Sequence, residues 1–161
     1  MAAHSATTRR SAEPVDRLSE VAELLGGRKV WKHPPATKLE VHDAIVRGIP
    51  GRALIHVFEN VKGIPAQKLS SVIGVSYRTV QRRAGSPGKA LSEDQGGRLW
   101  KFAEILKAAT ELQGSPAAAE QWLSRPAMAL DGRAPIDLMA TLAGAEMVED
   151  LLTRLKYGVY T

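Results

Sequence analysis

The chain has 161 residues, of which 44% are hydrophobic and 24% charged, enough for one domain with a sizeable core or two small domains that share an interface. It contains no cysteine, which excludes disulfides, thiolate nucleophiles and cysteine-ligated zinc. No apolar run approaches the roughly 20 residues that a membrane-spanning helix needs, and the first residues lack the apolar stretch of a secretion signal. We therefore expect a cytoplasmic protein without a membrane segment.

The net charge of +5 is divided unevenly along the chain. Up to Ala90 there are 15 Lys and Arg against 7 Asp and Glu, a net charge of +8, and after Ala90 there are 7 against 10, a net charge of −3. No acidic residue lies between Glu59 and Glu93, whereas six basic residues do. Such a basic region indicates nucleic-acid binding, and an acidic region beside it indicates another role. The alternative is that the charge run is only a solvated face.

The first 37 residues are expected to form a variable tail with one short helix. Residues 1–15 are small and polar, a composition typical of disorder. Apolar residues on one face and a terminating glycine pair predict a helix over residues 16–25. The prolines in residues 29–38 indicate a linker. Residues 38–47 are compatible with a strand or a helix, and we favour the helix.

The remainder of the chain carries helical signals throughout, namely apolar residues at helical spacing, N-capping serines and terminating glycines. Helices are expected over residues 52–62, 65–73, 76–84, 92–112 and 116–124, from Pro135 onward, and over a last segment that ends near Gly158. No strand alternation competes with them, so the predicted fold class is all-α. We expect a helix-turn-helix domain over residues 38–91 and a small helical domain with a C-terminal tail over residues 92–161.

The helices expected on either side of Gly74 have the layout of a helix-turn-helix. Glycine adopts the positive φ of such a turn without steric cost. Ser70, four residues earlier, is small enough to let the two helices cross closely. Val80, six residues later, is placed to bury against the first helix, and Ser76 is placed to cap the second.

With Val80 inward, the rotation of 100° per residue places Arg78 and Arg82 on the outer face of the second helix. Arginine can donate two hydrogen bonds to guanine and glutamine can pair with adenine, while a serine at a helix N-terminus can bind phosphate. We expect Arg83, nearer the flank, to contact the DNA backbone. The candidate DNA-binding residues are Ser76, Tyr77, Arg78, Thr79, Gln81, Arg82 and Arg83. The alternative is a basic, solvent-facing helix of an unrelated bundle.

No catalytic or metal-binding set is visible in the sequence. The four histidines are not spaced with acids as metal ligands would be. The segment "GSPGKA" at 85–90 lacks the glycine and the Ser or Thr of a phosphate-binding loop, and no nucleophile elbow or dinucleotide fingerprint occurs. We expect Trp31, Trp100 and Trp122 to be core or interface anchors. The protein is therefore expected not to be an enzyme and to need no cofactor or metal.

The half that follows Ser92 contains the string "AAEQWLSRPAMALDGRAPIDLMATLAGAEMVEDLLTRLKYGVYT". It resembles the toxin-binding domain of the Xre/MbcA/ParS family of antitoxins. The matching features are Trp122-Leu123, Pro126, Leu130, Gly132, Pro135, Asp137-Leu138, Gly144, Val148, Leu151-Leu152 and Tyr157-Gly158. The preceding "GIPGRALIHVFENVKGIPAQKLSSVIGVSYRTVQRR" is similar to the helix-turn-helix domain that accompanies it, with "SxRTxxRR" as its most specific piece. The resemblance covers about residues 38–161.

This resemblance implies both a partner and a function. Antitoxins of this family are encoded beside a toxin with a RES domain, which is related to ADP-ribosyltransferases and often consumes NAD. The resemblance implies that the last helix and the tail enter the active-site cleft of the toxin and that the helix-turn-helix represses the shared operon. The candidate toxin-binding residues are Arg154, Lys156, Tyr157, Gly158, Val159 and Tyr160. The two tyrosines in this tail suit an interface, because tyrosine offers a large contact area at a small entropic cost.

Two alternatives stay open. The stripe of Val148, Leu151, Leu152 and Leu155 would serve as core whether or not the tail binds a toxin. A protein with the same sequence features could also be a free-standing transcription regulator whose second half only dimerises or senses a ligand. In either case we expect a homodimer on a palindromic site, with Trp100 and Phe102 of the long helix as a candidate seam.

Overall fold

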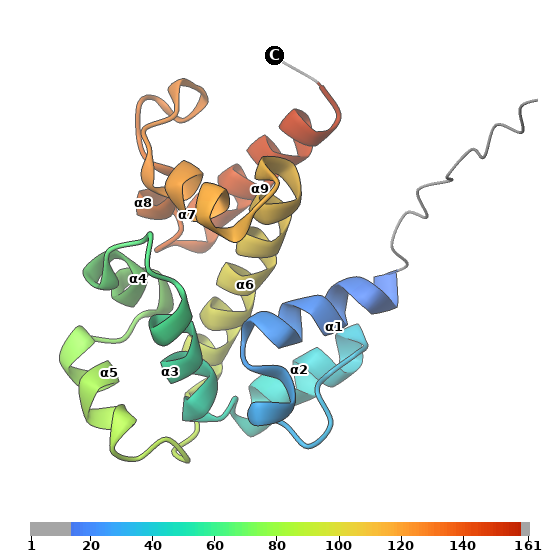
Figure 1. Ribbon diagram of the computed structural model, residues 1–161, viewed down its shortest axis with the longest axis vertical. Helices are drawn as coiled ribbons and strands as arrows, with labels where there is room; N and C mark the ends of the chain where they lie inside the picture. Colours follow the sequence, from blue (N-terminus) through green and yellow to red (C-terminus); the bar gives the residue numbers. More distant parts are fainter. Residues whose placement is uncertain (1–13, 159–161) are drawn as a thin grey trace, which may run out of the picture.

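The structure is a computed structural model that describes residues 14–158, with side chains described from residue 17 onward (Figure 1). Its α-helices are α1 (Pro14–Leu24), α2 (Lys38–Arg47), α3 (Gly51–Asn60), α4 (Ala66–Ile73), α5 (Tyr77–Ala84), α6 (Glu93–Gln113), α7 (Pro116–Ser124), α8 (Pro135–Leu138) and α9 (Leu142–Lys156). Single 3₁₀ turns, η1 (Gly27–Lys29) and η2 (Met128–Leu130), lie in two connections. The described part holds two isolated β-bridges but no strand, so the all-α prediction is confirmed.

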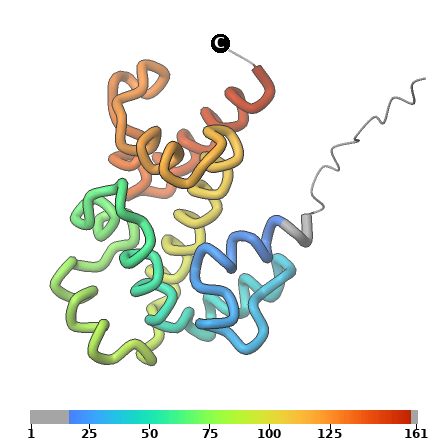
Figure 2. Tube along the Cα trace, viewed as in Figure 1, coloured from blue at the N-terminus to red at the C-terminus, as the bar shows by residue number. Residues whose placement is uncertain are grey.

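Helix α6 runs through the centre of the molecule (Figures 1 and 2). It packs against α1, α2, α4, α7 and α9, and these helices share one continuous apolar core. Trp100 and Phe102 are only 3% and 1% exposed. The expectation that these two side chains form a dimer seam is therefore wrong, because the core of a single chain already buries both.

Helix α1 is an integral part of this core. Val21, Ala22 and Leu25 are buried, and a salt bridge between Lys107 and Glu20, with Nζ and Oε2 2.9 Å apart, joins α1 to α6. The helix expected over residues 16–25 is thus present, and it begins at Pro14. Disorder was expected over residues 1–15, and of these only residues 14 and 15 belong to the described part of the chain.

A capping box decides the conformation of residues 38–47. The backbone N–H of Glu40 donates to Oγ1 of Thr37, and the carboxylate of Glu40 accepts from the backbone N–H of Thr37, each at 3.2 Å. This reciprocal pair satisfies two of the donors that a helix leaves open at its start. The spacing Thr-x-x-Glu is visible in the sequence and would have favoured the helix over the strand.

The α8–α9 turn requires Gly144. A Cβ added there would lie 1.8 Å from the carbonyl oxygen of Leu138, far inside van der Waals contact. The hydroxyl of Thr141 caps α9 by accepting from the N–H of Gly144 at 3.0 Å, and Nη1 of Arg98 in α6 donates to the carbonyl of Ala140 at 2.8 Å. Close packing at this turn therefore fixes how α9 leaves α8 and lies along α6.

Candidate functional site

The α4–α5 turn has the geometry of a helix-turn-helix. Gly74 adopts the left-handed conformation with φ 78°, and its N–H donates to the carbonyl of Ser70 at 2.9 Å. Ser70 is buried and its hydroxyl donates back to the carbonyl of Ala66, so it adds no bulk between the helices. Val80 is buried, and α5 packs against both α3 and α4. The structure confirms the expected positions of these three residues.

The N-terminus of α5 lies at the surface. Oγ of Ser76 accepts from the N–H of Thr79 at 3.1 Å, which is the N-cap bond expected from the sequence. Beside it is a hollow of about 340 Å³ that is lined mainly by polar residues and backbone. The lining residues are Gln67, Ser70, Ser71, Gly74, Val75, Ser76 and Tyr77.

The outer face of α5 carries Arg78, Gln81 and Arg82, all exposed. Helix α5 forms an outer edge of the molecule (Figure 1). Within residues 17–158, no carboxylate pairs with Arg78 or Arg82. Two uncommitted guanidinium groups on a protruding helix form a surface for an anionic partner.

Two residues of α5 also hold the helix in place, a role that the sequence did not indicate. Nη1 of Arg83 donates to the carbonyls of Lys89 and Ala90, both at 3.3 Å, and so holds the turn after α5. The ring of Tyr77 lies 6.4 Å from that of Phe58, between ring centres, which braces α5 against α3. The Tyr77–Phe58 contact joins two different helices, and the Arg83 bonds depend on how the loop after α5 folds back, so helix periodicity indicates neither of them.

The end of α9 carries the described part of the expected toxin-binding set. Tyr157 is 71% exposed, and the ammonium of Lys156 lies 5.7 Å from the centre of its ring. Gly158 follows with φ 68°, and Arg154 is half-buried. Val159 and Tyr160 lie outside the described residues. Further back, Val148, Leu151 and Leu152 are buried, so this stripe of α9 belongs to the core.

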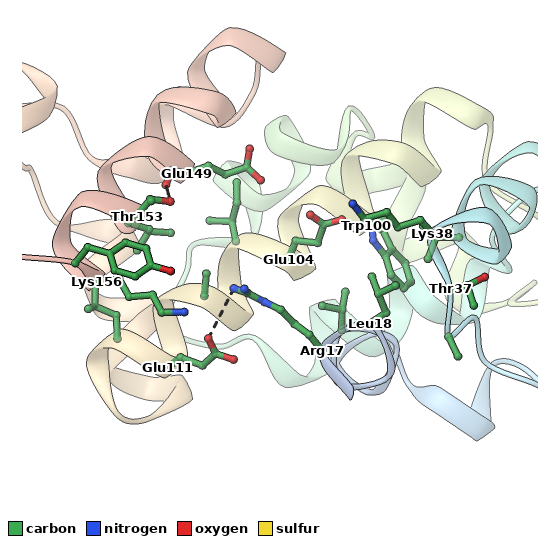
Figure 3. Close-up of a pocket in the computed structure, with 18 residues that line it drawn as sticks. Arg17, Leu18, Thr37, Lys38, Trp100, Glu104, Glu111, Glu149, Thr153 and Lys156 are labelled. Carbon is green, nitrogen blue, oxygen red and sulfur yellow. Dashed lines mark hydrogen bonds and ion pairs between the residues drawn. The ribbon is translucent and has the colours of Figure 1, made fainter. Parts of the chain in front are cut away.

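A groove of about 890 Å³ lies between α1, α2, α6 and α9 (Figure 3). Its walls include Leu18 of α1, Val41 of α2 and Leu152 of α9, and Lys156 and Tyr157 lie on its rim. Trp100 also lines it, and its buried indole N–H has no hydrogen-bond partner among the described residues. Sequence analysis missed this groove because its residues come from four separate segments.

Lys101 joins α6 to α9 beside this groove. Its ammonium lies 3.0 Å from the carboxylate of Glu149 and 3.5 Å from that of Glu104. Partial burial of Lys101 disfavours its charged form, but the hydrogen bond to Glu149 and the charges of both glutamates outweigh this effect and raise the pKa of Lys101. The lysine is therefore held in its charged form between two acids.

Within residues 14–158, no group of three or more histidines and acids is arranged to hold a metal ion. None of the described helices combines the length and apolarity that crossing a membrane requires.

The fold and these surfaces define an all-helical protein in which a helix-turn-helix unit and a second helical unit share one core. Residues 40–104 match the family model of the antitoxin Xre-like helix-turn-helix domain, and residues 108–158 match that of the antitoxin Xre/MbcA/ParS C-terminal toxin-binding domain. The two matches meet inside α6.

Three curated relatives, each called antitoxin Xre, are similar to the chain. The protein of Yersinia enterocolitica is 31% identical over 140 residues, covering 83% of this chain and 92% of the relative. The protein of Pseudomonas putida is 27% identical over 123 residues, covering 76% and 75%. The protein of Photorhabdus laumondii is 29% identical over 89 residues, covering 55% and 60%. The chain belongs to the Xre/MbcA/ParS family of antitoxins of type II toxin-antitoxin systems.

Proposed function

We propose that the protein neutralises a RES-domain toxin that consumes NAD, and that it represses its own operon by binding operator DNA. The observation that carries this proposal is the placement of two exposed surfaces. Helix α5 with Arg78 and Arg82 and the end of α9 with Tyr157 lie at opposite ends of the molecule (Figure 1). A DNA duplex and a toxin can therefore be bound at the same time.

The DNA-binding part rests on the outer face of α5. The guanidinium groups of Arg78 and Arg82 can each donate two hydrogen bonds to a guanine, and Gln81 between them can pair with adenine. One such helix reads few base pairs, so we propose that a homodimer binds a palindromic operator. The basic charge of the first half would add sequence-independent attraction to phosphates.

The toxin-binding part rests on the end of α9. Tyr157 is exposed beyond the last buried turn, so its side chain is free to contribute to binding without loss of core packing. Lys156 beside it, and Arg154 one turn earlier, supply positive charge toward a cleft built to accept the phosphates of NAD. In this proposal residues 157–160 cover the active site of the toxin, and the antitoxin acts in the cytoplasm without catalytic activity of its own.

Co-expression with the adjacent gene tests the proposal. The neighbour expressed alone should arrest growth and lower cellular NAD, and co-expression of the antitoxin should restore both. A reporter fused to the promoter of the operon should be repressed by the antitoxin. Repression without rescue would identify a free-standing transcription regulator instead.

A further inference from the structure

The turn that follows α5 is fastened to the start of α3. The carbonyl of Lys89 accepts from the backbone N–H of Gly51 at 3.0 Å and from Nη1 of Arg83 at 3.3 Å. The turn lies so close to α3 that a Cβ added at Gly51 would stand 2.5 Å from the same carbonyl oxygen. Pro50 and Ala90 form an isolated β-bridge beside this contact. The position of the turn is therefore set by α3 and by Arg83 together.

Two cations stand where this turn meets α3. Arg52 directly follows Gly51, and Lys89 is bonded to Gly51 through its carbonyl, so the two basic residues adjoin each other. Both are exposed. In the part of the chain whose side chains are described, neither forms a salt bridge. Their charge is therefore available to an anionic partner.

The acids nearest in sequence lie apart from this pair. Between Asp43 and Glu93 the sequence has one acid, Glu59. Glu59 stands in the last turn of α3, about 10 Å along the helix axis from Arg52. Glu93 begins α6 and lines a hollow of about 380 Å³ beside α4 and α9. The two cations at the turn thus keep their net positive charge.

The turn continues the surface of α5. Helix α5 runs directly into it, and the two form one outer edge of the molecule (Figures 1 and 2). Arg78 and Arg82 are exposed on α5, and Lys89 follows Arg82 by seven residues. The sugar-phosphate strands of a duplex border its major groove, so a helix that lies in the groove has phosphates beside it. The turn stands at the end of α5, where such phosphates would pass.

Arg83 is bound to the turn itself. It is half-buried, and its Nη1 donates to the carbonyls of both Lys89 and Ala90. A guanidinium held in this way supports the loop that carries Lys89.

We propose that Lys89 and Arg52 bind the DNA phosphates beside α5, and that Arg83 is a positioning residue that holds the turn carrying Lys89. The inference rests on the operator binding of the proposed function and gives it a second contact surface, formed by the turn after α5 and the start of α3. Phosphate contacts of this kind fix the orientation of a protein on the duplex and carry no base preference. They therefore complement the base contacts proposed for Arg78 and Arg82.

The salt dependence of binding to a duplex that carries the promoter of the operon tests the phosphate contacts. K89A/R52A should flatten the slope of log affinity against log salt concentration by about 1.8, because each phosphate contact contributes roughly 0.9. The affinity gap to the wild type should therefore narrow about tenfold between about 50 and 200 mM salt. The preference at each base pair should stay that of the wild type, unlike the preference of R78A.

R125A/R133A is the matched control. It removes the same charge from two exposed positions in the connection between α7 and α8, and neither arginine forms a salt bridge within the described side chains. Its slope should stay close to that of the wild type. Both double variants should melt like the wild type, because the replaced side chains are exposed. Equal slopes of K89A/R52A and R125A/R133A would overturn the phosphate contacts, since charge would then act only through the net charge of the protein.

A mutant cycle tests the role of Arg83. R83A alone should flatten the slope, because a turn that is no longer held misplaces Lys89. In the K89A/R52A background, R83A should leave the slope unchanged, since the contacts that it positions are already absent. A further flattening by about 0.9 in that background would show that Arg83 contacts a phosphate itself, and would overturn its positioning role.

Directed cleavage locates the turn on the DNA, and the absence of native cysteine allows a single label. A K89C chain that carries a thiol-linked iron–EDTA group should cut the promoter duplex at the edge of the protected site. An R125C chain with the same label should not cut there. Equal cutting by both, or none by K89C, would contradict the proposed contact.

The outcomes separate this inference from the proposed function. A wild-type chain that does not bind the promoter would overturn both the operator binding and the contact surface. If R78A and R82A lose affinity while K89A/R52A binds like R125A/R133A at every salt concentration, operator binding by α5 stands and only this inference fails.

Discussion

The backbone N–H of Gly63 donates a hydrogen bond to the carboxylate of Glu120, 57 residues further along the chain, with N and Oε2 3.2 Å apart. Gly63 lies between α3 and α4, and Glu120 lies in α7 with its side chain buried. The hydroxyl of Ser124 donates to the carbonyl of Gly63 at 3.3 Å. Both backbone groups of one loop residue are thus bound by α7, which joins the helix-turn-helix to the second half.

Loss of the Glu120 carboxylate should weaken this joint. We expect E120A to lower the free energy of unfolding by about 1–3 kcal/mol, because a hydrogen bond to a charged acceptor is removed and packing is lost at a buried site. E146Q, at an exposed position of α9, is the control and should change it by less than about 0.5 kcal/mol. Urea denaturation measures both. Equal stability of E120A and wild type would show that the loop is held by other contacts.

Two glycine substitutions should shift stability in opposite directions. G144A should destabilise the protein by about 3 kcal/mol or more, because its Cβ would collide with the carbonyl oxygen of Leu138. G97A should stabilise it by about 0.5–1 kcal/mol, because Gly97 lies inside α6 with open space around the added methyl group. Thermal unfolding of both variants checks this pair. A melting temperature of G144A close to that of the wild type would mean that the α8–α9 turn relaxes at little cost in free energy.

Arginine substitutions on α5 should separate base readout from backbone contact. R78A and R82A should each cost about 1–3 kcal/mol of operator binding and relax the preference at one base pair. R83A should weaken binding to every DNA sequence by the same factor and should reduce the salt dependence of that binding. It should also loosen the turn after α5 that Arg83 holds. R125A, exposed in the second half, is the control. Electrophoretic shifts on the promoter of the operon in which neither R78A nor R82A loses affinity would refute the assignment.

Removal of residues 157–161 should abolish toxin inhibition while preserving the fold. The deletion begins after Lys156, where α9 ends, so melting temperature, helicity and DNA binding should stay close to those of the wild type. The measurement is the NADase activity of the toxin at equal occupancy by full-length and truncated antitoxin. Equal inhibition by both would place the inhibitory contact elsewhere on the protein.

The contribution of Lys101 to the free energy of unfolding should decrease at high pH. Its folded-state pKa is raised above the ordinary value of 10.5, so folding favours the charged form. The stabilisation is complete below about pH 10 and is lost as the pH rises through the folded-state pKa. The difference in unfolding free energy between wild type and K101M should therefore be constant from pH 7 to about pH 10 and narrow above it. K101R keeps its charge and should show no such narrowing.

Short-range signals accounted for most of the secondary structure. N-caps at Ser76, Ser92 and Ser115, together with apolar spacing, indicated their helices because capping and amphipathicity act within one or two turns. The end of α3 was less well defined, and the helix stops at Asn60, before Gly63.

By itself, the sequence determined the all-α class, the turn at Gly74 and the outward direction of Arg78 and Arg82, because each follows from helix geometry within about ten residues. Only the tertiary structure decided which apolar faces meet within one chain. An apolar stripe has the same pattern whether it is buried in the core or against a partner, so the burial of Trp100 and Phe102 by helices from both ends of the chain required the fold. The groove and the hydrogen bond between Gly63 and Glu120 likewise depend on packing between segments far apart in the sequence. Local sequence patterns extend over only a few residues and cannot predict such contacts.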